Sequence, residues 1–151
     1  MSQDIDLTQA NSTNAPIWGM NPDTYCLLLH LSQLLGMSAL PILGWAVPVV
    51  LWVLNKDKNE QIDQHGKHAM NWMISLIIYT TAAMALSAAF AFFLFIIMFC
   101  TRLFLFPIGL LVWSPIFLLL WAAAFIFPII AAVKAHKGIA WKYPLSITFF
   151  K

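Results

Sequence analysis

Three long apolar runs without a charged side chain dominate the chain. Residues 24–55, 68–101 and 103–133 contain no Asp, Glu, Lys or Arg, and the runs are 32, 34 and 31 residues long. A helix crosses the hydrocarbon core of a bilayer with about 20 apolar residues. Each run is therefore long enough to cross a membrane at least once, and the pattern predicts an all-α integral membrane protein.

The first apolar run is too long for one crossing and is interrupted by helix breakers. Leucines at helical spacing predict an amphipathic helix over about 25–37. Two glycines and two prolines then follow within thirteen positions: Gly36, Pro41, Gly44 and Pro48. Because proline removes a backbone donor and clashes with the preceding turn, this pattern favours two short helices with a break near 38–44. One long kinked helix is the alternative.

A hydrophilic connection, residues 55–67, separates the first run from the second. After it, a helix is predicted from about Asp63 or His68 to Cys100, with no proline inside it. The whole pattern predicts a four-helix bundle built as two helical hairpins. Three spans with a kinked first helix remain the alternative.

The third apolar run carries two internal prolines. Arg102 and Pro107 mark the turn before it, and Pro115 and Pro128 lie within it. Proline is a common cause of sharp helix kinks. We therefore expect kinks or a shortened span over about 108–133.

Polar residues outside the runs set the expected domain limits. Residues 1–23 are polar and acidic, without Lys or Arg, which predicts a flexible tail rather than a cleavable signal. The membrane helical domain is expected over 24–147, and 148–151 form the C-terminal end.

Composition agrees with a membrane protein and excludes several other classes. Hydrophobic residues make up 62% of the chain and charged residues 9%, whereas soluble domains have about half and about a quarter. The formal net charge of +2 comes from local clusters. No basic stripe of the kind that meets nucleic-acid phosphates is present, so no nucleic-acid partner is expected.

The lysines predict which side of the membrane each connection faces. Three lie in 55–67 and four lie in the C-terminal segment: Lys134, Lys137, Lys142 and Lys151. The positive-inside rule places both clusters on the cytoplasmic side of a bacterial inner membrane. Two hairpins would put the N-terminus on the same side, and a kinked single span would put it on the other side.

Neutral polar side chains within the apolar runs are the main candidate site residues. Four recur at helical spacing in the second run: His68, Asn71, Ser75 and Tyr79. His30 and Gln33 form a second pair in the first run and are expected to partner them. Because lipid cannot satisfy polar groups, the stripe must face other helices or water. It either fixes the bundle as a buried network or lines a hydrophilic path.

Two pairs of small residues mark candidate packing faces. Ala85-x-x-x-Ala89 and Ala131-x-x-x-Ala135 each allow another helix to approach closely. They serve either internal packing or an interface with other membrane proteins or copies of this chain.

No catalytic, cofactor or metal motif stands out. Nucleophile elbows, phosphate loops and dinucleotide glycine motifs are absent from the sequence, so no enzyme and no cofactor are expected. His65 and His68 lie near Asp63, but no second ligand cluster accompanies them, and no metal site is predicted.

Several short segments occur in an order that resembles one known family. They are Leu28-x-His30-Leu31-Ser32 followed by Gly36, Pro48-Val-Val-Leu-Trp52, Asn55-Lys-Asp57-Lys58, Ile62-Asp63-x-His65-Gly66-Lys67-x-Ala69-x-Asn71-Trp72-x-Ile74-Ser75, Ala132-x-Lys134-Ala135-x-Lys137-Gly138 and Tyr143-Pro144-Leu145. This order resembles the small bacterial membrane proteins of unknown function related to the twenty-kilodalton component of the chloroplast inner-envelope import translocon. The resemblance implies a four-helix membrane bundle, and it defines no catalytic or ligand residues.

These observations lead to a functional hypothesis with two rivals. A small chain with little extramembrane surface is expected to be a non-enzymatic subunit or accessory factor of a larger membrane assembly. The first rival is a component of a protein- or solute-conducting channel, and the second is a lipid- or metabolite-binding module with its ligand beside His30. In each case the lipid bilayer is an expected partner.

Overall fold

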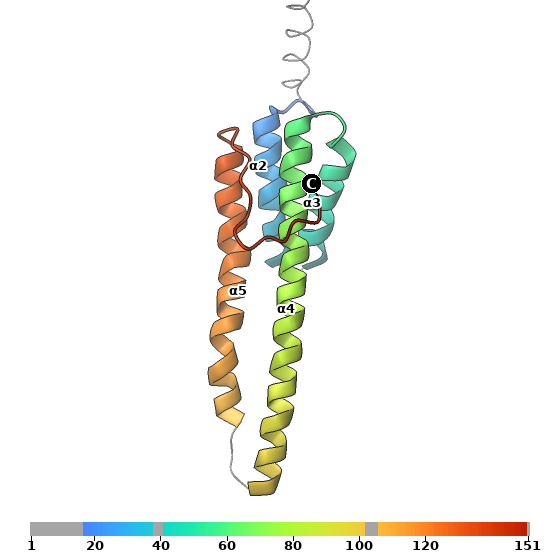
Figure 1. Cartoon of the computed structure of the whole chain (residues 1–151). Coiled ribbons are helices and arrows are strands. Elements are labelled where there is room, and N and C mark those ends of the chain that lie inside the picture. The colour runs from blue at the N-terminus through green and yellow to red at the C-terminus, as the bar shows by residue number, and fades with distance from the viewer. Residues whose placement is uncertain (1–16, 38–40, 102–105, 151) are drawn as a thin grey trace, which may run out of the picture. The chain divides into compact units, whose positions relative to one another are not determined.

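The computed structural model describes residues 17–37, 41–101 and 106–150 (Figure 1). Within these ranges the regular structure is helical, without a β-strand, and follows this order: α2 (Pro22–Ser32), the 3-10 helix η1 (Gln33–Met37), α3 (Pro41–Asn55), α4 (Glu60–Thr101) and α5 (Phe106–Ala135). The predicted all-helical class and the four α-helices are confirmed. The break expected at 38–44 falls partly, and the turn at Arg102 wholly, outside the described residues.

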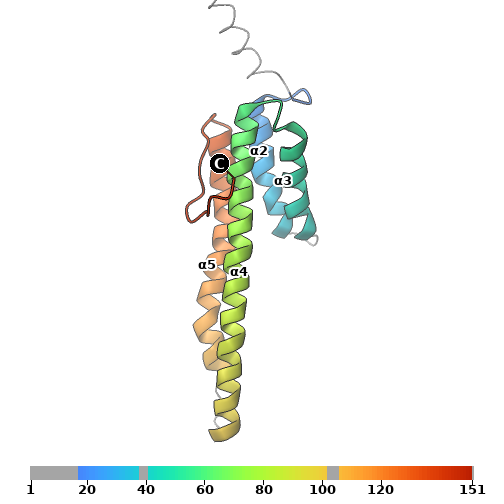
Figure 2. The same cartoon turned by 45° about the vertical axis from the view of Figure 1, so that its right-hand side comes forward.

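The chain folds into two compact units. The first draws its described residues from Met1–Met73 and Phe125–Lys151, and the second from Ile74–Ala124. Helices α4 and α5 each contribute one end to each unit. In the first unit, α2 and α3 lie side by side and form a short helical hairpin (Figures 1 and 2).

Helix α2 begins with a local capping arrangement. The Asn21 side chain accepts a hydrogen bond from the Asp23 amide at 3.2 Å, and Pro22 occupies the first turn. Asparagine and proline are favoured at these positions, because the first amides of a helix lack partners within it. Residues 17–20, which we assigned to the polar tail, form a turn that packs Ile17 against Tyr25.

Helix α4 begins earlier than the hydrophobic pattern predicts. The Asn59 carbonyl oxygen Oδ1 accepts from the Gln61 amide at 2.8 Å, so the helix starts at Glu60. An ion pair between Asp63 and Lys67 at 2.6 Å, one turn apart, then supports its first turns. The 55–67 segment is therefore mostly helix, and the connection to α3 is only a few residues long.

Helix α5 continues through both of its internal prolines. It spans 30 residues and includes Pro115 and Pro128, so the span is not shortened, and the alternative expectation of kinks stays a prediction. Each proline removes one backbone donor, and the helix continues on the remaining bonds.

Helix α5 ends at a glycine that redirects the chain. Gly138 has a positive φ of 70°, its amide bonds to the Ala135 carbonyl at 2.9 Å, and the Ile139 amide bonds to the Lys134 carbonyl at 3.0 Å. This pair of bonds is a Schellman cap, which needs a left-handed residue that glycine adopts without strain. The cap turns the C-terminal segment, residues 139–150, back onto the first unit.

Two helices are long and apolar enough to cross a membrane. They are Glu60–Thr101 and Pro107–Ala135, and only 6% and 17% of their most apolar 18-residue windows are buried within the chain. A core helix of a water-soluble protein would be mostly buried instead. Helices α2 and α3 have 11 and 15 residues, which correspond to about 17 and 22 Å, less than the ~30 Å of a bilayer core.

Candidate functional site: a buried histidine–tyrosine cluster

Two histidines and a tyrosine meet inside the first unit. His30 on α2 bonds through Nδ1 to the Tyr143 hydroxyl at 2.7 Å and through Nε2 to Nδ1 of His65 on α4 at 3.0 Å. Gln33 donates from Nε2 to the same Tyr143 oxygen at 3.0 Å. The three ring side chains are at most 2% exposed. We call His30, Gln33, His65 and Tyr143 the polar cluster.

The bonds of the polar cluster assign its protons. The Tyr143 oxygen accepts from Gln33, and its own O–H has an acceptor in His30 Nδ1. Neutral His30 then carries its proton on Nε2 and donates to His65 Nδ1, so neutral His65 carries its proton on Nε2. In the opposite direction the Tyr143 O–H would have no acceptor among the described residues. The cluster is therefore a line of neutral groups that connects α2, α4 and the C-terminal segment.

The line ends at a buried nitrogen. His65 Nε2 has no hydrogen-bond partner among the described residues, and the same holds for Nδ1 of His68, one turn further along α4. No group of three or more His, Cys, Asp or Glu side chains in the described part of the chain is arranged to hold a metal ion. The polar cluster contains no carboxylate. Its hydrogen bonds can join α2, α4 and the C-terminal segment.

Aromatic rings enclose the tyrosine end of the polar cluster. Tyr143 stacks on Trp72 of α4 with a centroid distance of 5.5 Å and an interplanar angle of 1°. Phe127 of α5 lies 5.0 Å from Trp72, and Trp141 lies 5.4 Å from Tyr143, measured between ring centroids. Burial among these rings raises the pKa of Tyr143 above its usual range. The phenol is consequently neutral, as the proton assignment requires.

Asn71 holds the end of the C-terminal segment. Its Oδ1 accepts from the amides of Phe149 and Phe150 at 2.8 Å each, and its Nδ2 donates to the Phe150 carbonyl at 2.9 Å. The Phe150 ring also meets Trp52 of α3 at 5.4 Å and 72°. One side chain on α4 thus binds two consecutive peptide groups of the extended segment.

Helices α3 and α4 meet at a glycine. A Cβ atom at Gly66 would overlap the Trp52 ring, so only glycine lets the indole lie against the α4 backbone. The Trp52 indole nitrogen donates to Asp63 Oδ1 at 3.0 Å. This contact fixes α3 against the start of α4.

The structure distributes the predicted polar residues over both units. His30, Gln33, His68 and Asn71 belong to the first unit, whereas Ser75 and Tyr79 belong to the second. Asn71 and Ser75 are buried, and His68 and Tyr79 are half-buried. His30 and Gln33, which were expected to partner the stripe on α4, bond instead to His65 and Tyr143.

The two predicted alanine pairs lie in different surroundings. Ala131 and Ala135 are 1% and 0% exposed and pack within the first unit. Ala85 and Ala89 are exposed on α4 in the second unit.

Sequence reasoning missed two members of the polar cluster. His65 falls in the segment predicted as a hydrophilic connection, where a histidine is expected to be exposed. Tyr143 lies in a segment without helical period, so no spacing relates it to His30, 113 positions earlier. One feature of the sequence could have indicated that His65 belongs to the helix. It lies three positions before His68, and this spacing places both side chains on adjacent turns of one helix.

Fold and site together define a small helical protein with two membrane-length apolar helices and a buried, neutral polar cluster. Over residues 21–150 the sequence matches the model of the MamF/MmsF family, the magnetosome magnetite crystal formation protein family. The chain belongs to this family. The comparisons with curated proteins and with solved structures found no match.

The resemblance to translocon-related proteins is therefore wrong. The family match covers the same part of the chain as the segments that suggested it. Those segments are short, and the structure uses several of their residues for local packing: Gly66 accommodates Trp52, Asn71 holds the C-terminal backbone, and Gly138 caps α5. Local packing roles of this kind do not by themselves identify a family.

Proposed function

We propose that this chain is a non-enzymatic membrane protein that assists magnetite crystal formation in the magnetosome as an accessory subunit of a larger membrane assembly. One observation carries the proposal: the most apolar windows of α4 and α5 are only 6% and 17% buried within the chain. Exposed apolar surface of this extent requires a lipid or protein cover. Membership of the magnetite crystal formation family supports the cellular role.

The exposed alanine pair on α4 is the proposed contact with a partner helix. Ala85 and Ala89 lie one turn apart on one face and are exposed. Small residues at this spacing let helix backbones approach closely, which favours association between membrane helices. The buried pair Ala131 and Ala135 is already used for packing within the first unit, so the α4 pair is the one accessible to a partner.

The internal bonding of the polar side chains supports a structural role for them. His30, Gln33 and Asn71 all have partners within the first unit. A solute-conducting channel, the rival function, would need water along the stripe on α4. Both lysine clusters are proposed to face the cytoplasm, as the positive-inside rule predicts.

Purification in a gentle detergent tests the partner interface. We compare the natural chain with Ala85→Leu/Ala89→Leu, which enlarges the proposed face, and with Leu119→Phe, which enlarges an exposed position of α5. The natural chain and Leu119→Phe should co-purify with one identified membrane protein at constant stoichiometry, and the double variant should lose it. A natural chain that purifies alone, or a double variant that keeps the partner, contradicts the proposal.

A further inference from the structure

Residues 139–150 lie on the first unit in the manner of a bound peptide. They form one turn and otherwise no regular structure, and they cross α4 from α5 toward α3 (Figure 1). Asn71 holds the end of the segment by three hydrogen bonds to the main chain of Phe149 and Phe150. Because only main-chain groups take part, these bonds fit any extended peptide, and specificity is left to neighbouring side-chain contacts.

Two aromatic side chains of the segment supply those contacts. The Tyr143 hydroxyl enters the polar cluster, and its ring stacks on Trp72. Seven positions later the Phe150 ring meets Trp52 at 5.4 Å between centroids. The surface that receives the segment is made by Asn71 and by side chains on both sides of it. We call this surface the peptide site: His30, Gln33, Trp52, Asn71 and Trp72.

The chain's own segment is a poor ligand for the peptide site in two respects. Its turn is closed by a hydrogen bond of 3.3 Å from the Ser146 amide to the Tyr143 carbonyl, with Pro144 in the second position. Leu145 takes the third position with φ of 64°, where a type II turn calls for glycine and an L side chain is strained. The Ser146 hydroxyl is also buried without a hydrogen-bond partner among the described residues. A peptide without these two costs should bind more tightly.

The segment is also placed to leave the site. Leu145 is 73% and Phe149 49% exposed, and the turn at residues 136–138 that connects the segment to α5 is exposed. Parts of a protein with few buried contacts open locally at the lowest cost. After release, Asn71 would lose three hydrogen bonds and the polar cluster would lose Tyr143. Since such losses are costly, a replacement peptide is favoured over an empty site.

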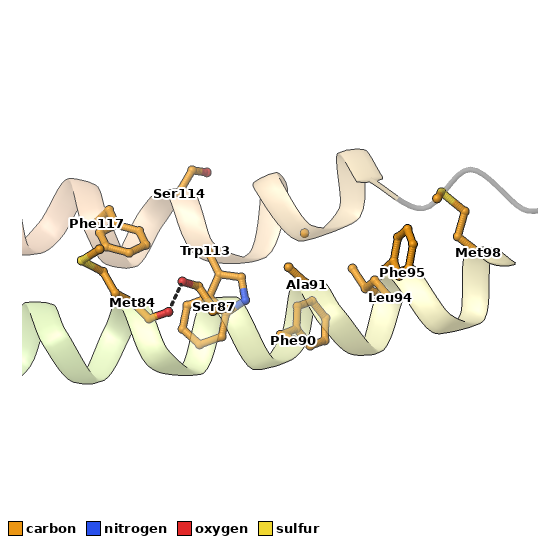
Figure 3. A pocket seen from close by; sticks show the side chains of 12 residues that line it. Met84, Ser87, Phe90, Ala91, Leu94, Phe95, Met98, Trp113, Ser114 and Phe117 are labelled. Atoms are coloured by element: carbon orange, nitrogen blue, oxygen red, sulfur yellow. Dashed lines mark hydrogen bonds between the residues drawn. The ribbon is translucent and has the colours of Figure 1, made fainter.

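The groove between α4 and α5 in the second unit is not a site of this kind. None of the residues that line it is charged, and the Ser87 hydroxyl donates to the Met84 carbonyl at 2.9 Å within α4 (Figure 3). Ser114 points away from α4 in the same view, and the Trp113 indole nitrogen is buried. The described side chains of the groove therefore provide no anchor for a peptide main chain comparable to Asn71.

We propose that the peptide site binds an extended segment of a partner protein in exchange for residues 139–150 of this chain. The partner segment carries a tyrosine, a glycine in the place of Leu145, and an aromatic residue seven positions after the tyrosine. A second copy of this chain would bring the same strained turn and the same unpaired hydroxyl, so it gains nothing over the segment already bound. The peptide site lies within the first unit, and the inference does not depend on the proposed partner face at Ala85 and Ala89.

Fluorescence anisotropy of a labelled peptide with the full chain in a mild detergent measures the exchange. The probe has the sequence of residues 143–150 with Leu145→Gly and Ser146→Ala, an amidated end and an N-terminal label on a glycine linker. Phe149→Pro/Phe150→Ala in the chain removes one amide donor and one ring from its own segment. This variant should bind the probe at least about tenfold more tightly than the natural chain, because its internal competitor is weakened. Ile139→Ala, an exposed position of the same segment, should bind like the natural chain.

Two further comparisons locate the bound peptide. Asn71→Ala, added to the variant with the weakened segment, should reduce its affinity for the probe at least about tenfold, and thermal unfolding by circular dichroism verifies that it folds. A probe with proline in the place of Phe149 lacks an amide donor to Asn71 and should bind at least about tenfold more weakly. This second comparison changes only the peptide, so it tests the site even if Asn71→Ala unfolds.

The sequence of the peptide tests the choice of partner. A peptide with the natural sequence of residues 143–150 should bind the weakened variant at least about fivefold more weakly than the probe, because it keeps the strained turn. Equal affinity of the natural chain and the weakened variant, equal binding of the probe and its proline form, or full binding by a folded Asn71→Ala variant overturns the proposal. Equal binding of the probe and the natural sequence overturns the preference for a partner over a second copy.

Discussion

At the scale of single residues, the first unit is organised around neutral hydrogen-bonded side chains. Tyr143 accepts from Gln33 and donates to His30, and His30 reaches His65. An unpaired buried polar group is costly, so each member depends on its neighbours. The tyrosine hydroxyl is the link between the C-terminal segment and helix α2.

Removing that hydroxyl should destabilise the protein. Tyr143→Phe keeps the stack on Trp72 but leaves His30 Nδ1 buried without its donor, so the free energy of unfolding should fall by about 1–3 kcal/mol. Denaturation in detergent measures the change. Ser146→Ala is the matched control, because it removes a buried hydroxyl that has no hydrogen-bond partner among the described residues. An equal loss of unfolding free energy in both variants would mean that the Tyr143 hydrogen bond contributes no more than removal of an unbonded buried hydroxyl.

The raised pKa of Tyr143 predicts how stability depends on pH. Burial raises this pKa in the folded state, whereas the unfolded value is about 10. The protonated phenol therefore contributes its full stabilisation below about pH 10, and this is lost as the pH rises through the folded pKa. In absorbance titrations near 295 nm, the phenolate signal that Tyr143→Phe removes should appear only well above pH 10. Ionisation of that phenol at its ordinary pKa would contradict the buried position.

At the scale of secondary structure, side chains on α4 hold the surrounding elements. Trp52 on α3 lies against Gly66, and the C-terminal segment ends on Asn71. The long uncharged apolar runs in the sequence predicted α4 and α5, because runs of this length are typical of membrane-spanning helices. They did not predict where α4 starts, because the Asn59 cap and the single buried Ile62 make no repeating pattern.

A methyl group at Gly66 should separate α3 from α4. Gly66→Ala places Cβ into the Trp52 ring, and overpacking of this kind costs about 1–3 kcal/mol of stability. In a Trp52→Ala background the same change should be neutral or stabilising, because alanine has a higher helix propensity than glycine by about 1 kcal/mol. Unfolding measurements on the four proteins of this double-mutant cycle give the coupling. A coupling energy near zero between the two substitutions would contradict the close contact of Gly66 with the Trp52 ring.

The Asn71 side chain should control exchange at the end of the C-terminal segment. Asn71→Ala removes the acceptor of the Phe149 and Phe150 amides, and loss of about 1.4 kcal/mol would accelerate their hydrogen exchange roughly tenfold. Asn71→Asp keeps an acceptor for both amides and should retain most of the protection. Unchanged exchange in Asn71→Ala, measured by mass spectrometry, would show that the segment is held elsewhere.

At the scale of the whole molecule, the buried polar side chains make internal contacts, whereas the exposed apolar surface is available for external ones. The polar side chains of the first unit bond to one another, and the apolar faces of α4 and α5 are left for lipid or protein. Composition predicted this division, because charges are confined to the connections and ends of the chain. The partners of His30 could not be predicted, since His65 and Tyr143 come from segments that the apolar pattern does not describe. Short motifs also suggested a family that the match over residues 21–150 overturns.

Thiol labelling at Ser75 tests most directly whether the chain acts through its apolar faces rather than through a water path. Ser75 is fully buried and lies on the predicted polar stripe. In a background that lacks Cys26 and Cys100, we compare Ser75→Cys with Lys137→Cys, an exposed control, in native membranes opened to both sides. A membrane-impermeant maleimide should label the control and leave Ser75→Cys unlabelled. Rapid labelling of Ser75→Cys would reveal water along the stripe, and would contradict the sealed, partner-binding subunit in favour of a channel.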